Sequence, residues 1–532
     1  MGDSLDKLNT VYRYHNETKH HFQRYARSLG FLDWSSQPDP FRRYGGANVV
    51  RLRLPGSQDT PTWDGLFTDG GKPGPVDHES ISRFFYFSLA LSAWKEVVSP
   101  QGEVVSRWAL RVNPSSGNLH PTEGYLVNAD GVFHYASDEH ILEKRAVFES
   151  SEWSKFAENL PEGAFLAGLT SIHWRETWKY GERAFRYCQH DVGHALAALA
   201  LSAACLGWRI RLLEGPKTTE VARLLGVDGQ SGPEKEHPDC LVAVFPDSQD
   251  SGLVFSSLPP VGDLTGFPNR LSREHQDWPI IPEVAGASEW TGGAQARESN
   301  ITNFPRETAD RGLSAHGLIR GRRSAVAMDG RSSMNRESFH RLMDRLMPGR
   351  GHPVFDAAPG LDNVSLAMFV HRIDGLTPGL YVLVRHPDHE KSLRDSFRSD
   401  FLWEKPEGCP DELPLFALDE GDLRDTSRQL SCGQAIAADG AFSLGMLARF
   451  DHALSGNGPG MYPRLFWETG LIGQMLYLEA EAAGVRGTGI GCFFDDEVHR
   501  VLGIEDHAWQ SLYHFTVGAA VDDDRLQTVA AY

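Results

Sequence analysis

The chain has 532 residues, 41% of them hydrophobic and 23% charged, and its formal net charge is −19. This length exceeds one small core, so a globular protein with two or more domains is expected. The acidic surface argues against nucleic acid or an anionic membrane as partner, because both would repel it. The N-terminal segment lacks the apolar core of a secretory signal, and no run of about 18 apolar residues predicts a membrane-spanning helix.

Six cysteines are scattered along the chain without a CxxC pair. This pattern favours free thiols in a reducing cytoplasm over a disulfide framework or a zinc site. His190 and His194 are four residues apart, but HDVGH lacks the glutamate of a zinc-protease HExxH. We therefore expect a cytoplasmic protein without a bound metal.

Residues 1–75 form a polar leader that we assign to no regular structure. The first distinctive segment follows it, RVNPSSGNLHPTEGYLV at 111–127, where six loop-forming residues precede a predicted core strand. Asn-Pro and Gly-Asn are turn dipeptides, and the serine and asparagine side chains can also hydrogen-bond a partner outside their own backbone. The segment is either an ordinary loop or the edge of a binding site.

The segment TWKYGERAFRYCQHDVGH at 177–194 is dense in titratable groups. A lysine beside a tyrosine can lower the tyrosine pKa, so Lys179 and Tyr180 form a candidate proton-transfer pair. The alternative is that these are core residues whose polar tips find partners inside the protein.

Two segments beginning at His190 and Thr469 are alike. Each predicts a long Ala/Leu-rich helix, a glycine turn, a loop and a second short helix. Three pairs of glycines align between them: Gly193 with Gly473 and Gly207 with Gly487 at an offset of 280, and Gly226 with Gly503 at 277. This alignment puts three extra residues in the first copy. Upstream of each copy, 124–135 and 367–384 both predict a strand, a turn and a second strand.

The repeat predicts an α+β protein in which one domain is duplicated. We place the first domain at 76–247, a Pro/Gly/Ser-rich linker at 248–315 and the second domain at 316–532. A duplicated fold often replaces a homodimer, so we expect an intramolecular pseudo-dimer with functional sites between its halves. Further association of the chain is left open.

The second half carries two further candidate motifs. Arg322, Arg323 and Ser324 precede a predicted helix, and guanidinium groups with a hydroxyl suit a phosphate. RGTGIGCFFDD at 486–496 has three glycines in five positions, which lets backbone N–H groups approach a flat ligand. A solvated helix approach and a helix end followed by a turn are the respective alternatives.

Taken together, four motifs resemble the flavin-dependent nitroreductase superfamily, specifically the SagB-type dehydrogenases that include thiazoline/oxazoline oxidases. They are NPSSGNLHPTE (113–123), KYGERAFRY (179–187), RRS (322–324) and TGIGCFFDD (488–496). The resemblance begins near residue 76. It implies a mainly antiparallel sheet flanked by helices in each domain, with FMN held between two domains.

The resemblance also implies roles for individual residues. Lys179 and Tyr180 match the pair that azoline oxidases use for proton abstraction. The implied FMN-binding residues are a phosphate group of Arg322, Arg323, Ser324 and Arg525, a loop along the flavin of Pro114, Ser115, Ser116 and Asn118, and a backbone near flavin N5 of Gly489, Ile490 and Gly491.

The two halves differ in these motifs. The first half has no Arg-Arg-Ser before its first helix, and the second half has FDAAPGLDNV where Pro-Ser-Ser-Gly-Asn would stand. One composite site therefore keeps both components and the other keeps neither, which predicts one FMN per chain. Val326 stands where the family often has a second cation.

We expect an FMN-dependent oxidoreductase acting on a small molecule or peptide. If Lys179 and Tyr180 face the pocket, oxidation of a C–H bond beside a heteroatom is favoured; if not, an NAD(P)H-fed reductase is. One alternative is an accessory protein that binds a partner, with or without flavin, and has lost catalysis. A hydrolase using Ser115 or Ser116 with His120 is a weaker alternative, because no GxSxG motif accompanies them.

Overall fold

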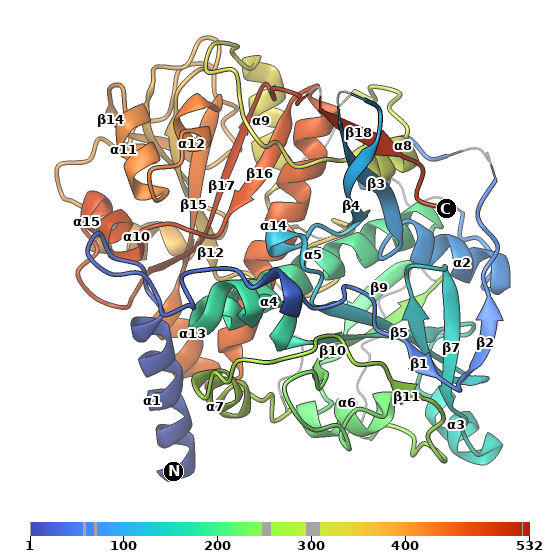
Figure 1. Cartoon of the computed structure of the whole chain (residues 1–532). Helices are drawn as coiled ribbons and strands as arrows, with labels where there is room; N and C mark the ends of the chain where they lie inside the picture. The colour runs from blue at the N-terminus through green and yellow to red at the C-terminus, as the bar shows by residue number, and fades with distance from the viewer. Residues whose placement is uncertain are drawn as a thin grey trace.

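Each half of the protein is built on one antiparallel sheet (Figure 1). The computed structural model describes residues 2–56, 60–68, 72–99, 101–246, 257–293, 309–349, 351–523 and 525–532. The first sheet has the order β2-β7-β6-β5-β8-β10-β9 and the second β14-β13-β12-β15-β17-β16. The first contains β2 (Asn48–Arg51), β5 (Thr122–Asn128), β6 (Gly131–Ala136), β7 (Ile141–Ala146), β8 (Phe165–Ser171), β9 (Arg209–Leu212) and β10 (His237–Phe245). The second contains β12 (Val364–Val370), β13 (Gly379–Leu383), β14 (Leu415–Glu420), β15 (Phe442–Ala448), β16 (Arg486–Ile490) and β17 (Gln510–Gly518).

Both predicted strand pairs are present, and the α+β class is confirmed. β5 pairs with β6, and β12 with β13, each antiparallel. Shorter helices cover the sheets and the ends of the long helices: α2 (His78–Tyr86), α3 (Ser150–Ala157), α4 (His173–Tyr180), α6 (Thr218–Leu225), α8 (Ala315–Gly321), α9 (Arg336–Arg345), α10 (His389–Ser396), α11 (Arg424–Leu430), α12 (Ile436–Asp439), α13 (Phe450–Asn457) and α15 (Asp495–Leu502).

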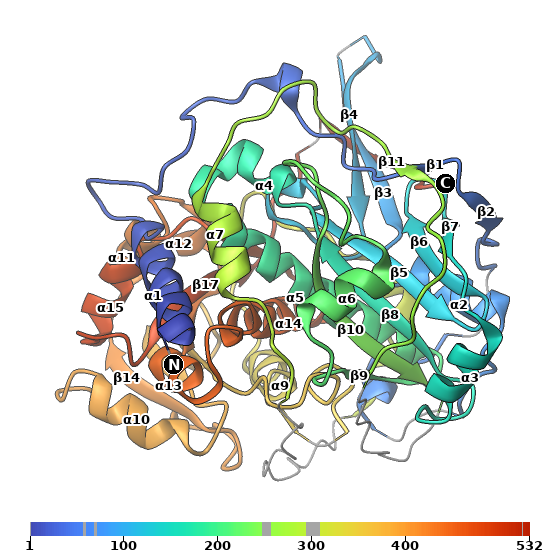
Figure 2. The same cartoon turned by 90° about the horizontal axis from the view of Figure 1, so that it is seen from below.

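Two helices of 22 residues, α5 (Ala184–Cys205) and α14 (Met461–Ala482), cross at the centre between the sheets (Figures 1 and 2). Nearly all of their residues are buried, because apolar residues occur around both helices, and the polar side chains among them are buried as well. At the crossing a Cβ on Gly193 would lie 2.8 Å from the Cα of Gly470 and 2.1 Å from the carbonyl oxygen of Trp467. Only glycines let the two backbones meet this closely.

The part of the repeat that contains the long helices has one constant offset, which corrects the sequence alignment. From β8 and β15 to α6 and α15, matching elements start 277 residues apart, as for α5 and α14 (461 minus 184). Gly193 therefore matches Gly470, not Gly473, and Gly207 matches Gly484, since both follow the long helix with positive φ. The first copy has no three-residue insertion. The offset of 280 arose because small apolar residues recur along both long helices, so that the two sequences can be aligned in more than one register.

The ends of the chain are exchanged between the halves. The leader, which was left unassigned from the sequence, contains the helix α1 (Gly2–Glu17). Its Tyr12 Oη donates to Asp451 of the second half at 2.6 Å, and its Tyr14 Oη donates to the carbonyl of Glu182 of the first half at 2.7 Å. At the other end, β18 (Leu526–Val529) pairs with β3 (Leu91–Val98) of the first half, which also pairs with β4 (Val104–Arg111). In Figure 1 the helix α1 lies beside α13, and the C-terminus lies beside the first half.

The described part of the predicted linker wraps around the molecule. β11 (Phe267–Pro268) pairs with β1 (Tyr44–Gly45), and α7 (Ile280–Ala287) lies beside α1 (Figure 2), where Arg13 forms an ion pair with Glu283. Residues 248–256 and 294–308 of that segment fall outside the described residues. Within the described ranges, no helix combines the length and the apolar character that crossing a membrane requires. The domain boundaries themselves stay a prediction.

Candidate active site

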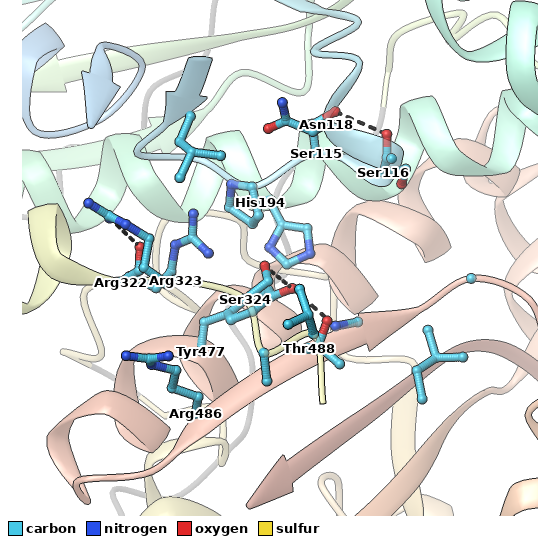
Figure 3. Close-up of a pocket in the computed structure, with 18 of the residues that line it drawn as sticks. Ser115, Ser116, Asn118, His194, Arg322, Arg323, Ser324, Tyr477, Arg486 and Thr488 are labelled. Atoms are coloured by element: carbon cyan, nitrogen blue, oxygen red, sulfur yellow. Dashed lines mark hydrogen bonds between the residues drawn. The ribbon is translucent and has the colours of Figure 1, made fainter. Parts of the chain in front are cut away.

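A cavity of about 920 Å³ lies between the two halves. The first half contributes the loop between β4 and β5 with side chains from α4 and α5, and the second contributes residues 322–326, α14 and β16 (Figure 3). Ten predicted site residues line it: Tyr180, Arg322, Arg323, Ser324, Pro114, Ser115, Ser116, Asn118, Gly489 and Gly491. Ile490 lines it as well, and both Gly489 and Ile490 lie in strand β16 rather than in the predicted loop.

The loop at 113–118 is held in a tight conformation with left-handed residues. Gly117 has φ +58°, and a Cβ there would lie 2.6 Å from the Tyr180 hydroxyl and 3.0 Å from Lys179 Nζ. Asn118 also has positive φ, and its Nδ2 donates to the carbonyl of Ala109 at 2.9 Å. The loop is thus fixed against both β4 and α4, which presents its serines to the cavity.

Arg322 is a buried cation that forms no ion pair with a carboxylate among the described residues. Its Nε and Nη2 donate to the carbonyls of Val112 and Arg111 at 3.3 and 3.4 Å. Its Nη1 has no hydrogen-bond partner within the described part of the chain. Burial lowers the pKa of Arg322, because the charged form loses water.

Further cations gather at the same end of the cavity. Burial, then the charge of Arg322, lowers the pKa of Arg323 to about 10. Burial and Arg323 lower the pKa of Lys95. Arg486 also lines this end and forms an ion pair with Asp522. This concentration of positive charge in an acidic protein suits an anionic group.

Tyr477 connects the cationic end to strand β16. Ser324 Oγ donates to the Tyr477 hydroxyl at 3.0 Å, and the backbone N–H of Gly489 donates to the same hydroxyl at 3.0 Å. The N–H of Ala325 also donates to the carbonyl of Gly487 at 3.0 Å. Ser324 and the glycine strand are therefore positioned as one unit (Figure 3).

Two buried carboxyl groups lie behind the loop. Asp191 accepts from the N–H of Ser116 at 3.1 Å and from its Oγ at 3.0 Å. Burial raises the pKa of Asp191 to about 7, although these hydrogen bonds oppose the shift. Neither oxygen of Glu176 has a hydrogen-bond partner among the described residues, and burial, then Asp191, raises its pKa well above the usual range.

The structure corrects the expected effect of Lys179 on Tyr180. Burial raises the pKa of Tyr180 well above its ordinary value, and Glu176, Tyr187 and Asp191 add to the rise. Lys179 Nζ lies 5.3 Å from the Tyr180 ring centroid, behind Gly117 and not among the lining residues. Tyr180 therefore stays protonated at neutral pH.

Arg525 is not at the cavity, contrary to expectation. Its side chain is 80% exposed and forms a two-pronged ion pair with Asp523, two residues before it. The cavity is instead lined by Leu526 and Thr528, which follow it on alternate positions. The sequence analysis did not identify Arg486 and Lys95 as cavity residues. Arg486 is the first residue of the glycine-rich motif at 486–496, so its place in that motif could have indicated it.

The other polar residues of interest, His120, His190 and His194, have the following contacts among the described residues. Both ring nitrogens of His120 lack partners within the described ranges, and Ser115 Oγ accepts the His120 backbone N–H at 2.8 Å. His190 contacts Thr469, and His194, which lines the cavity unpredicted, contacts Gln474 and Tyr513. The residues that the structure describes include no cluster of three or more metal-ligating side chains.

At the position that the pseudosymmetry of the two halves relates to this cavity, a backbone hydrogen bond joins the corresponding strand and segment. β9 matches β16, and the segment before β12 matches the loop before β5. The N–H of Leu212 in β9 donates directly to the carbonyl of Ala357 at 2.7 Å. The matching strand and loop at the first position are instead separated by the cavity.

Three solved structures were compared with this chain, and one of them shares its architecture. A crystal structure from Anabaena variabilis assigned to the nitroreductases has 22% identity and a TM-score of 0.69, and covers 96% of this chain and 99% of that chain. The E. coli microcin synthetase McbBCD complex with truncated pro-MccB17 has a chain with 19% identity and a TM-score of 0.25, covering 46% and 94%. A structure from Exiguobacterium sibiricum, assigned to the nitroreductases and solved in complex with FMN, has 14% identity and a TM-score of 0.23, covering 39% and 88%.

The first of these comparisons supports the tandem fold along the whole chain, and the other two scores are too low to carry an argument. No curated protein matches the sequence. The family model described as "Nitroreductase family" matches residues 75–244 and 380–519, which together make up more than half of the chain. The protein therefore belongs to the nitroreductase family of oxidoreductases.

Proposed function

We propose that the protein is an FMN-dependent oxidoreductase of the SagB type with one composite site. The observation that carries the proposal is the cavity between the halves. Its cationic end comes from the second half, and its polar loop comes from the first. A ligand with a charged tail and a flat polar ring would contact both.

The residues present fit FMN. The unpartnered Nη1 of Arg322 and the mutual repulsion among the cations would both be relieved by a phosphate. Ser324 would add a hydroxyl donor, and Ser115, Ser116 and Gly489 would lie along the ring. When bound, FMN supplies two-electron hydride transfer.

The bridged counterpart supports one FMN per chain. The Leu212–Ala357 hydrogen bond joins the strand and loop between which a second ring would have to lie. Ahead of α2, the buried Asp64 pairs with Arg311 and Arg345, so an acid precedes α2 whereas Arg322 precedes α9.

The side chains around the loop would handle the proton. Tyr180 keeps its proton at neutral pH, so its hydroxyl would donate a hydrogen bond to the substrate. It would act as a base only after another group had accepted its proton. Asp191, whose pKa is about 7, is the group whose charge changes near neutral pH, and the Ser116 hydroxyl connects it to the cavity. Lys179 lies on the far side of Gly117 and would orient Tyr180.

This arrangement favours oxidation of a C–H bond beside a heteroatom in a small molecule or peptide. NAD(P)H is the alternative reaction partner, as electron donor for a reductase. The fused halves would make further oligomerisation unnecessary for a complete site.

Flavin released by denaturation and counted against protein tests the proposal. We expect one FMN per chain, and Arg322→Ala with Ser324→Ala should weaken FMN binding by ten-fold or more, since a charge-assisted hydrogen bond is worth about 1.5–3 kcal/mol. Arg525→Ala is the matched control and should leave binding unchanged. Protein that takes up no FMN would favour an accessory protein that binds a partner, and two FMN per chain would contradict the single site.

A further inference from the structure

Two cysteines from distant segments meet at the rim of the cavity. Cys432 follows α11, and Cys492 follows β16 directly after Gly491. Their sulfur atoms are 2.7 Å apart. Cys492 also lines the cavity. A small rotation of either side chain would bring the sulfurs to the roughly 2 Å of a disulfide bond.

The backbone holds the pair in place. Cys432 has φ +55°, a left-handed conformation that non-glycine residues seldom adopt. Gln434 then donates from Nε2 to the carbonyl of Cys492 at 3.0 Å, which fixes the two segments to each other. The left-handed conformation of Cys432 therefore occurs at the point where its thiol lies against that of Cys492.

The surroundings give the two thiols different characters. The hydrogen bond from Cys432, followed by His20 and Arg183 and opposed by burial, lowers the pKa of Cys492 to about 5. The same hydrogen bond and burial raise the pKa of Cys432. Cys492 is therefore the more acidic of the two thiols, and the thiolate is the reactive form in disulfide exchange.

We propose that Cys432 and Cys492 form a second two-electron redox centre, which exchanges with small disulfides that enter the cavity. The Cys492 thiolate attacks one sulfur of the disulfide RSSR, forms a mixed disulfide and releases one thiolate RS⁻. The Cys432 thiol then loses its proton to solvent, attacks Cys492 Sγ and expels the second RS⁻. Taking up two protons, the products are two RSH and the Cys432–Cys492 disulfide, and excess RSH reverses the sequence.

Glutathione redox buffers test the centre in the full chain, with or without FMN, so the result is independent of the flavin proposal. The protein is equilibrated at graded ratios of reduced to oxidised glutathione, quenched with acid, alkylated and mapped by peptide mass. We expect the peptides of Cys432 and Cys492 to become linked as the ratio falls and to separate again as it rises. Alkylation of both thiols at the most oxidising ratio would overturn the proposal.

Single variants test the division of roles. Cys432→Ser should accumulate one glutathione on Cys492, whereas Cys492→Ser should leave Cys432 largely alkylated. Cys409→Ser, at a buried cysteine outside the pair, is the matched control and should behave as wild type. Accumulation on Cys432 rather than Cys492 would contradict the roles, and the wild-type mapping decides the redox pair even if a variant does not fold.

Discussion

Gly193 and Gly470 occupy the same position in the two halves and lie against each other where α5 crosses α14. Other self-matching contacts surround them. Phe185 and Tyr462, also 277 residues apart, stack with ring planes 3° from parallel. A local twofold axis therefore passes through this crossing, as in a symmetric dimer interface.

Gly193→Ala should destabilise the protein by about 1–3 kcal/mol, because a Cβ would press on the backbone of α14 and neither helix can move without shifting its sheet. Gly470→Ala should have a similar effect, since its Cβ would lie 2.3 Å from the carbonyl oxygen of His190. Urea unfolding measures the loss. Gly286→Ala in the exposed face of α7, where a Cβ meets nothing within 4 Å, is the control and should not destabilise.

Asp495→Asn should cost about 3–5 kcal/mol of unfolding free energy, because it leaves two buried guanidinium groups without their counter-charge. Asp495 pairs with Arg183 at 3.0 Å and Arg186 at 2.8 Å, and it accepts the N–H of His20 at 2.9 Å. Burial would raise its pKa, but the arginines outweigh burial and hold it low. Asp400→Asn, which breaks an exposed pair with Arg398, should change the unfolding midpoint little. Equal effects of the two changes would contradict this reading of the buried cluster.

Asp191 should make stability fall as pH rises. Its pKa is raised from 3.8 to about 7, so its contribution is fully present below about pH 4 and is lost as pH rises through about 7. At about 1.4 kcal/mol per pKa unit, the change is at most about 4 kcal/mol. Asp191→Asn should flatten this slope in urea unfolding of flavin-free protein at pH 5 and pH 7.5. Asp411→Asn, at an exposed position, should keep the wild-type slope.

Tyr180→Phe should lower kcat for oxidation of a substrate C–H bond by about 10²–10⁴-fold, because the substrate loses its hydroxyl partner. Lys179→Met should lower kcat less, since Lys179 acts through Tyr180. FMN content should be unchanged in both. Reduction of a quinone by NADPH should also be unchanged, which separates the proton step from flavin binding. Tyr381→Phe, whose hydroxyl donates to Thr377 far from the cavity, is the control; equal losses in both assays would place Tyr180 in flavin binding instead.

The sequence predicted the duplication and most of the cavity because both leave local signals. Turn residues mark the loop at 113–118, and Arg322 and Ser324 are adjacent in the chain. It did not predict α1, since that helix contacts residues distant in the sequence, Glu182 in the first half and Asp451 in the second. The prediction that Arg525 lies at the cavity was wrong, because its side chain forms an ion pair with Asp523, two residues before it. The expected lowering of the Tyr180 pKa by Lys179 was wrong, because burial raises this pKa. Burial depends on the folded structure and cannot be read from two neighbouring residues in the sequence.

The exchanged ends mean that the covalent connection is not what holds the two halves together. The N-terminal helix α1 contacts the second half, and the C-terminal strand β18 pairs with β3 of the first half. Each half is therefore in contact with a segment from the opposite end of the chain. Separating the halves would require pulling both segments away as well as parting α5 from α14. A single cut in the connecting chain should therefore leave a nicked protein that still migrates as one particle and keeps its shared cavity.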